Sequence, residues 1–271
     1  MSFLLQLLLS HVESNDTWAR DHGPITLITD DGSKQRLLDF RFNGWGEKFE
    51  ADKDNAITRN LFAQGAFCGM LIDNDDLVLE GGSIDCDGKG TLFTTSQCLL
   101  APHRNQPMTK LQIERELKRR LAIDRVVWLN HGNLIGDDTD GHIDTIVRCA
   151  PADTLLYVTC TPDDVEQYED FRALEDELTA LRTKEGKSYR LLPLPTPRPI
   201  IDNGERLPAT YANFLIVNGA VIMPTYSQSD RDEQAQSIIA QAFPDREIIG
   251  IDAMTIIRQH GSVHCLTMQL Y

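Results

Sequence analysis

Long hydrophobic runs and targeting signals are both scarce in this chain of 271 residues. No apolar run approaches the roughly 20 residues that a membrane-spanning helix needs. The apolar segment 3–9 is short and carries neither a basic leader nor a small-residue cleavage site, so we expect a buried strand or helix there and not a signal peptide. The sequence therefore predicts a cytoplasmic protein that begins abruptly inside its own structure.

Paired cysteines are also missing. The six cysteines include no Cys-x-x-Cys pair, and most of them lie in apolar, strand-like runs. That pattern favours free thiols in a reducing compartment over a disulfide framework or a zinc site. Cys149 and Cys160 are typical of buried structural residues.

Positive charge is in short supply, because 26 Lys and Arg stand against 41 Asp and Glu and give a net charge of −15. Such a chain is poorly suited to nucleic acid or to an anionic membrane, and its field favours a cationic ligand. The length and the 41% hydrophobic content permit one large domain with a substantial core. We predict a single catalytic domain over residues 1–271.

A repeated order of elements runs along the chain: strand, strand, helix, strand, four times, followed by a helix and a strand. Hydrophobic periodicity and turn residues define the elements. The predicted strands cover 25–29, 36–40, 76–80, 83–86, 91–95, 125–129, 142–149, 154–160, 189–192, 213–217, 220–223, 247–251 and 262–270. The predicted helices cover 52–70, a stretch capped by Thr109, 163–182, 232–242 and 253–259.

The glycine- and aspartate-rich stretch 132–144 leads into the predicted strand 142–149. Side chains alternate between the two faces of a strand, so His142 and Asp144 should point the same way. An ordinary strand start with a solvated His and Asp would show the same pattern.

One polar or reactive residue recurs about once every sixty residues along the chain. A site on a pseudo-symmetry axis would require such a recurrence. These residues are Asp21, Glu80, His142, Asn213 and Cys265.

Four short motifs carry a resemblance to a known family. They are Asn-Asp-Thr-Trp-Ala-Arg-Asp-His-Gly-Pro at 15–24, Glu-Gly-Gly-Ser-Ile at 80–84, Gly-His-Ile-Asp at 141–144 and Gly-Ser-Val-His-Cys at 261–265. In this order they resemble agmatine deiminase and, more broadly, the bacterial (porphyromonas-type) peptidylarginine deiminases. The resemblance implies an α+β pentein fold, an α/β propeller of ββαβ modules around a pseudo-fivefold axis. Because only fourteen residues precede Asn15, the first module is expected to be short or absent.

The resemblance assigns roles that chemistry supports. A guanidinium carbon is a poor electrophile and needs a strong nucleophile, for which Cys265 resembles the family thiol. Asp21 and Asp144 resemble the carboxylates that accept paired hydrogen bonds from the guanidinium. His142 resembles the general acid and base, and Glu80 the carboxylate that orients it. Each acid could instead be an ordinary turn or loop residue.

The motifs do not assign a catalytic role to four further residues, Asn213, Trp18, Trp45 and His264. Asn213 resembles a pocket residue of unassigned role, and Trp18 and Trp45 could stack on a cation, although core packing explains both. Strand alternation places His264 away from Cys265, which favours a structural role. The same alternation disfavours a zinc set of His142, Asp144, His264 and Cys265, so we expect no metal and no other cofactor.

The expected function is hydrolytic deimination of agmatine to N-carbamoylputrescine and ammonia, a step of putrescine synthesis, through a cysteine-bound intermediate. Deimination of peptidyl or free arginine is the alternative within the same class. A catalytically incomplete, guanidine-binding relative is the alternative outside it. The expected partner is a small cationic guanidine, and a homo-oligomer is compatible with the sequence.

Overall fold

The computed structural model describes residues 8–29 and 31–270 and contains four three-stranded sheets of one design. In each, two antiparallel strands are followed by a helix and by a third strand parallel to the second. The first module joins β1 (Ile25–Ile28), β2 (Gln35–Arg41), α3 (Asp54–Ala63) and β3 (Met70–Val78). The predicted order of strand, strand, helix, strand is confirmed in all four rounds.

The other three modules follow in chain order. They comprise β4 (Ile84–Cys86), β5 (Thr91–Thr95), α5 (Lys110–Leu121) and β6 (Arg125–Leu129); β7 (Val147–Ala150), β8 (Thr154–Thr159), α6 (Tyr168–Ala180) and β9 (Arg190–Pro195); and β12 (Leu215–Val217), β13 (Ala220–Thr225), α7 (Ser229–Ala242) and β14 (Glu247–Asp252). A two-stranded hairpin, β10 (Ile201–Asp202) and β11 (Glu205–Arg206), precedes the last module.

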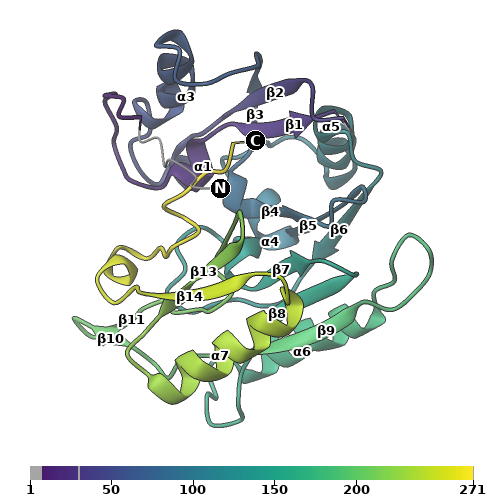
Figure 1. Ribbon diagram of the computed structural model, residues 1–271, viewed down its shortest axis with the longest axis vertical. Helices are drawn as coiled ribbons and strands as arrows, with labels where there is room; N and C mark the ends of the chain where they lie inside the picture. The colour runs from purple at the N-terminus through teal and green to yellow at the C-terminus, as the bar shows by residue number, and fades with distance from the viewer. Residues whose placement is uncertain (1–7, 30, 271) are drawn as a thin grey trace.

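The long helices lie on the outside, whereas the short helices α1 (Ala19–His22) and α4 (Ser96–Leu99) lie nearer the middle of the molecule (Figure 1). The other short elements are α2 (Gly44–Glu47) and the 3₁₀ turns η1 (Gly81–Ser83), η2 (Ile143–Thr145) and η3 (Ile256–Gln259). The fold is mixed α/β. None of the sheets formed by the described residues is closed, and the propeller around a pseudo-fivefold axis stays a prediction.

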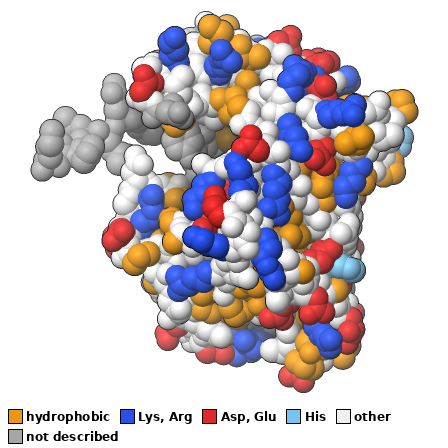
Figure 2. Space-filling view, turned by 90° about the vertical axis from the view of Figure 1, so that its right-hand side faces the viewer, with side chains coloured by type: hydrophobic (Ala, Val, Ile, Leu, Met, Phe, Trp, Pro, Cys, Tyr) orange, Lys and Arg blue, Asp and Glu red, His pale blue; other side chains and the backbone are white. Residues whose placement is uncertain are grey.

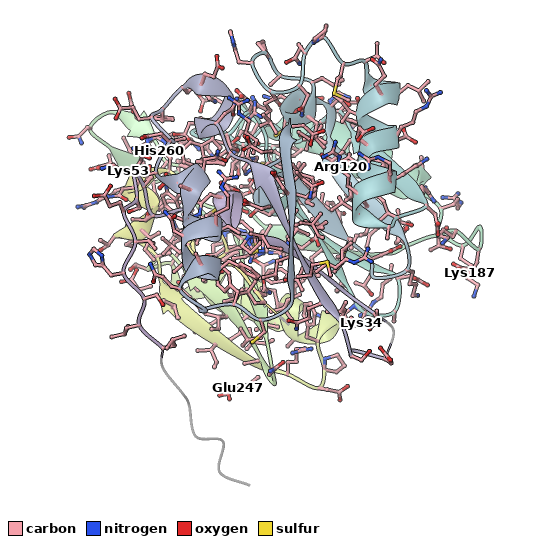
Figure 3. The ribbon with its side chains drawn as sticks, turned by 90° about the horizontal axis from the view of Figure 1, so that it is seen from above. Lys34, Lys53, Arg120, Lys187, Glu247 and His260 are labelled. Carbon is pink, nitrogen blue, oxygen red and sulfur yellow. The ribbon has the colours of Figure 1, made fainter. Side chains whose placement is uncertain are left out.

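Helix α5 illustrates how the sequence specifies a module. Thr109 and Gln112 form a capping box that satisfies the first backbone N–H groups, and Ala122 ends the helix in a left-handed conformation. One face buries Ile113 and Leu117 against the sheets. Arg120, labelled in Figure 3, forms two hydrogen bonds of 2.6 and 2.7 Å to the carboxylate oxygens of Asp76 on β3, which ties the first two modules together.

Two main hydrophobic clusters form the core. The larger one is built chiefly by the third and fourth modules, and the second by the first two modules. A small third cluster contains Trp18, Phe42, Trp45 and Cys265. On the face shown in Figure 2, Lys and Arg are numerous despite the net charge of −15. Within the described residues, no helix is both long enough and apolar enough to cross a membrane.

Three predicted elements are wrong. Strand 142–149 begins only at Val147, because His142 precedes the turn η2. Segment 262–270 forms no strand and folds back on itself, with the Leu266 N–H donating to the Ser262 carbonyl. Helix 52–70 ends at Ala63, and the chain then turns through Gly65, where φ is 75°, to enter β3. The composition of a short apolar run does not by itself distinguish a strand from a turn or from the end of a helix.

Two expectations concern cysteines and the N-terminus. All six cysteines are free, as the composition predicts. Of the predicted buried element at 3–9, residues 3–7 lie outside the described residues. Leu8 and Leu9 are 69% and 84% exposed, so burial is the wrong prediction for these two.

The core predicts a clear contrast between two leucines. Leu174 on α6 is fully buried in the larger cluster, whereas Leu111 on α5 is 58% exposed. We expect Leu174→Ala to lower the free energy of unfolding by about 2–5 kcal/mol, because it removes buried methyl groups and leaves a cavity. Leu111→Ala is the control and should change it by at most about 0.5 kcal/mol. Equal losses in urea unfolding would contradict this core.

Candidate active site

Three segments from different modules meet in the middle of the molecule, at α1, at η1 and at η2, and the segment 261–265 joins them. They bring together the five residues predicted to react, all of them buried: Asp21, Glu80, His142, Asp144 and Cys265. A cavity of about 320 Å³ is lined by Asp21, His142 and Cys265. Trp18 and Trp45, the two tryptophans named as candidate cation-binding residues, also line it. Two larger clefts, of about 520 and 640 Å³, contain none of these residues.

Asp21 is held by two donors. Its Oδ1 accepts a hydrogen bond of 3.0 Å from the Gly82 N–H, and its Oδ2 accepts one of 2.9 Å from the indole Nε1 of Trp45. Gly82 is required by close approach: a Cβ there would lie 2.6 Å from His142 Nδ1 and 2.8 Å from Asp21 Oδ1. The Glu-Gly-Gly motif thus lets Asp21 and His142 approach each other to 3.7 Å.

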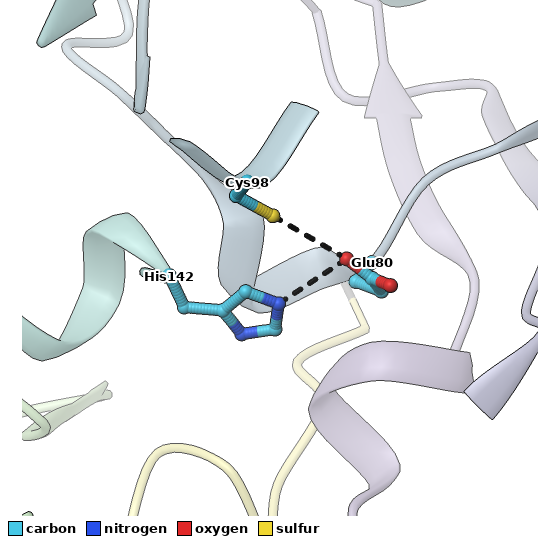
Figure 4. Close-up of side chains that lie close together, drawn as sticks. All are labelled: Glu80, Cys98 and His142. Carbon is cyan, nitrogen blue, oxygen red and sulfur yellow. Dashed lines mark hydrogen bonds and ion pairs between the residues drawn. The ribbon is translucent and has the colours of Figure 1, made fainter. Parts of the chain in front are cut away.

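Behind His142 lies a buried ionic network (Figure 4). The Nε2 of His142 is 3.2 Å from Glu80 Oε2, and Arg104 Nε donates to both Glu80 oxygens at 3.1 Å. The Nη1 of Arg104 continues to Asp140 at 2.7 Å. Cys98 Sγ lies 3.6 Å from Glu80 Oε2, the oxygen that His142 also approaches.

This network determines the protonation states of Glu80 and His142. Burial raises the pKa of Glu80, but the hydrogen bond from His142 and the charge of Arg104 outweigh it, so the pKa is lowered. Burial lowers the pKa of His142, but the charge of Asp21 and the hydrogen bonds to Cys98 and Glu80 hold it well above its usual value. Glu80 is therefore ionised and His142 is an imidazolium near neutral pH, as a general acid requires.

Asp144 has one satisfied and one free oxygen. Its Oδ2 accepts from His264 Nδ1 at 2.7 Å and from Asn213 Nδ2 at 3.2 Å, whereas its Oδ1 has no hydrogen-bond partner among the described residues. Burial and the nearby charge of Asp21 raise the pKa of Asp144 to about 7. Oδ1 is thus a hydrogen-bond acceptor for which the described part of the chain supplies no donor.

Asn213, whose role the sequence leaves open, contacts the predicted nucleophile. Its Oδ1 accepts hydrogen bonds from the backbone N–H groups of His264 and Cys265, at 3.0 and 3.3 Å, and lies 3.4 Å from Cys265 Sγ. Burial, Asp144 and Asp21, in that order, raise the pKa of the Cys265 thiol above its usual range. The resting thiol is therefore protonated.

The two tryptophans form walls of the cavity. Gly261 leaves room for Trp18, since a Cβ at this glycine would lie 2.2 Å from the Trp18 ring. Trp45 lies in the turn α2, with φ of 57°, and packs edge-on between Phe42 and Phe49. A bulky residue in the left-handed region is strained, and such strain is concentrated at functional sites.

Sequence reasoning missed several residues of the site. Arg104 lies in an irregular loop and nothing in its pattern indicates burial. His264 contacts Asp144, so the alternation argument was wrong because the segment is a turn and not a strand. The alternation within the predicted strand 142–149 was equally wrong, although His142 and Asp144 do reach the same site.

A metal is poorly accommodated here. Glu80, Cys98 and His142 place one ligand atom each within 4.8 Å of one another. Arg104 donates to both Glu80 oxygens, so the carboxylate that a metal would need as a ligand is already paired with the positive charge of an arginine.

The chain matches the family of Porphyromonas-type peptidyl-arginine deiminases over residues 2–270. A solved Porphyromonas gingivalis protein, provisionally named an arginine deiminase, is 50% identical with a TM-score of 0.92 over 96% of this chain and 77% of that one. The C. jejuni agmatine deiminase C315S with substrate bound is 38% identical, with a TM-score of 0.85 over 94% and 73%. A Vibrio parahaemolyticus protein provisionally named agmatine deiminase is 38% identical over 97% and 77%.

These similarities extend over nearly the whole chain. It belongs to the Porphyromonas-type peptidyl-arginine deiminase family, whose members are hydrolases acting on C–N bonds. A dimethylarginine dimethylaminohydrolase at 16% identity and a TM-score of 0.52 shares the fold alone. The predicted family is thereby confirmed.

The buried pair of Glu80 and Arg104 predicts a large stability effect. Arg104→Met leaves the Glu80 charge without its fixed cation, so we expect the free energy of unfolding to fall by about 3–5 kcal/mol. Arg119→Met removes an exposed partner of Glu116 and should cost at most about 1 kcal/mol. Urea unfolding checks both, and a loss for Arg104→Met no larger than for Arg119→Met contradicts the network.

The pKa of Asp144 is directly measurable. In protein labelled with ¹³C at aspartate carboxyl carbons, one signal should titrate near pH 7 and be absent from Asp144→Asn. Because a bound cation favours the ionised form, added guanidinium should lower that midpoint. A signal for Asp144 that titrates near pH 4 would contradict the burial described here.

Proposed function

We propose that this protein hydrolyses the guanidine of agmatine to N-carbamoylputrescine and ammonia, with Cys265 as the nucleophile. The observation that carries the proposal is the cavity wall that Asp21, His142 and Cys265 share, with Asp144 buried next to them and its Oδ1 unpaired among the described residues. A thiol, an imidazolium and two carboxylates are the groups that attack on a guanidinium requires.

The carboxylates would hold the planar cation. A guanidinium presents N–H donors in fixed directions, and carboxylates accept them as charge-assisted pairs. Asp21 is oriented by Trp45 and Gly82, and Asp144 keeps Oδ1 for the ligand. The rings of Trp18 and Trp45 limit the cavity beside them, where an aromatic face favours a cation.

The reaction proceeds in two halves. When the guanidinium binds, the Cys265 thiol loses its proton to water. The thiolate sulfur bonds to the guanidinium carbon, the bond to one amino group breaks, and that group leaves as ammonia after it takes the proton of His142. Water then adds to the carbon and gives one proton to His142, the C–S bond breaks with its electron pair on sulfur, the remaining O–H proton passes to that sulfur, and the ureido product leaves. Splitting the reaction at a covalent intermediate lowers each barrier.

Substrate charge would activate the nucleophile. Asp144 and Asp21 raise the pKa of Cys265 in the empty site, so a thiolate is disfavoured there. A bound guanidinium neutralises those two charges and removes most of that penalty. Binding and activation are therefore coupled, which limits thiolate formation to the occupied site.

The tail of agmatine is favoured over that of arginine by charge. Asp16, Asp137 and Asp138 also line the cavity, and no Lys or Arg of the described chain forms an ion pair with them. Asp137 accepts hydrogen bonds from the N–H groups of Thr139 and Gly141, whereas the Asp138 side chain accepts none from the residues that the structure describes. An ammonium group suits this mouth, and the α-carboxylate of free arginine is repelled by it. The product would serve putrescine synthesis.

Ammonia release from agmatine, free arginine and an arginyl peptide tests the choice of substrate. We expect agmatine to give the highest kcat/KM. Preference for the peptide or for arginine would establish the alternative activity of the family. Binding of all three guanidines without ammonia release would establish a binding module instead.

Cys265→Ala should reduce ammonia release below detection while agmatine still binds, because Asp21 and Asp144 remain. The control Cys68→Ala alters an exposed thiol far from the chemistry and should leave the rate unchanged. Turnover and calorimetric binding are measured on both. Substantial turnover by Cys265→Ala would overturn the covalent mechanism.

Asp138→Asn should raise KM for agmatine by about tenfold or more with little change in kcat, since one charge-assisted contact to the tail is worth about 1.5–3 kcal/mol. Asp76→Asn, at an exposed acid on β3, is the matched control. An unchanged KM in Asp138→Asn would remove this carboxylate from tail recognition.

A further inference from the structure

His264, the residue before the predicted nucleophile, has different partners on its two ring nitrogens. Its Nδ1 lies 2.7 Å from Asp144 Oδ2, and its Nε2 lies 3.3 Å from Nη2 of Arg148. The side chain of His264 is buried, at 7% exposure, and the Asp144 side chain is fully buried. Nothing in the roles proposed above uses this residue.

Arg148 fixes which nitrogen carries the proton. An arginine stays protonated and can only donate, so Nε2 of His264 must accept. Arg148 is itself held: Nε donates to Asp85 Oδ2 at 3.0 Å, Nη1 donates to the Ala212 carbonyl at 3.0 Å, and the guanidinium lies over the Phe214 ring at 4.6 Å. The proton of a neutral His264 is consequently on Nδ1, aimed at Asp144.

The surroundings keep His264 neutral. Burial lowers its pKa well below the usual value, and the charges of Arg148, Arg20 and His142 lower it further. A neutral ring can donate through Nδ1 and accept through Nε2 at the same time, which its two partners require. A protonated ring would set a hydrogen atom against the Arg148 N–H.

We propose that His264 is a positioning residue that fixes Asp144 for the guanidine, an inference that rests on the function proposed above. Its Nδ1–H and the Asn213 amide both donate to Oδ2, so the rotation of the carboxylate is set and Oδ1 is left for the substrate. Asp85 on β4, Arg148 on β7 and His264 beside Cys265 form a chain that ends at this carboxylate. The second module and the third thereby orient a ligand-binding group at the centre.

The chemistry of amide side chains gives a matched pair of variants. The amide nitrogen of asparagine lies near the position of Nδ1 and can donate to Asp144, whereas that of glutamine lies near Nε2 and cannot. We expect His264→Gln to raise KM for agmatine and to lower kcat/KM by about tenfold or more. His264→Asn should recover much of that loss. Equal losses in two folded variants, with unchanged melting temperatures, would overturn the proposal.

The tautomer can be read without substrate. In ¹⁵N-histidine-labelled protein near pH 7, long-range ¹H–¹⁵N spectra should show His264 as the neutral Nδ1–H form, and the assignment follows from the signal absent in His264→Gln. An Nε2–H or doubly protonated ring would overturn the proposal. This readout separates the two claims: a wild-type protein that releases no ammonia defeats the proposed function, while the tautomer still tests the chain from Arg148.

Discussion

Burial of several carboxylates in one small volume is the constraint on which the site depends. Asp21, Glu80 and Asp144 are each at most 4% exposed, and a buried charge without partners costs far more than a fold can offset. Each acid is therefore surrounded by donors: Trp45 and Gly82 for the first, Arg104 and His142 for the second, His264 and Asn213 for the third. The loops of the four modules meet where they do because these donors come from different modules.

The same constraint keeps protons on the acidic groups of the empty site. Asp144 remains near half-protonated around neutral pH, and the thiol of Cys265 stays protonated beside two acids. A bound cation would change both protonation states, because it pairs with the ionised carboxylates and lowers the free energy needed to form the Cys265 thiolate. In the proposed mechanism, affinity for the guanidine and reactivity of Cys265 therefore have a common physical origin.

The sequence predicts the frame of this arrangement well. Strand order and the approach of Asp21, Glu80, His142, Asp144 and Cys265 follow from periodicity and motifs that are local in the chain. Two segments that carry candidate site residues were wrongly predicted as strands, 142–149 in its first half and 262–270 throughout, because their apolar residues form tight turns that depend on the folded neighbours.

What the sequence could not supply are the groups that act through other groups. Arg104 was not predicted at all, and for His264 and Trp45 the residues were named but their hydrogen bonds to Asp144 and Asp21 were not. These three residues lie 24, 120 and 24 positions from their partners respectively, and no local pattern relates residues so far apart.

The most direct measurement of the central claim is mass spectrometry of the protein quenched during turnover of agmatine. We expect the peptide that contains Cys265 to gain the mass of agmatine less ammonia, and the other five cysteine-containing peptides to stay unmodified. Ammonia release at the normal rate, with no adduct on Cys265 at any quench time that resolves the first turnover, would contradict covalent catalysis by this thiol.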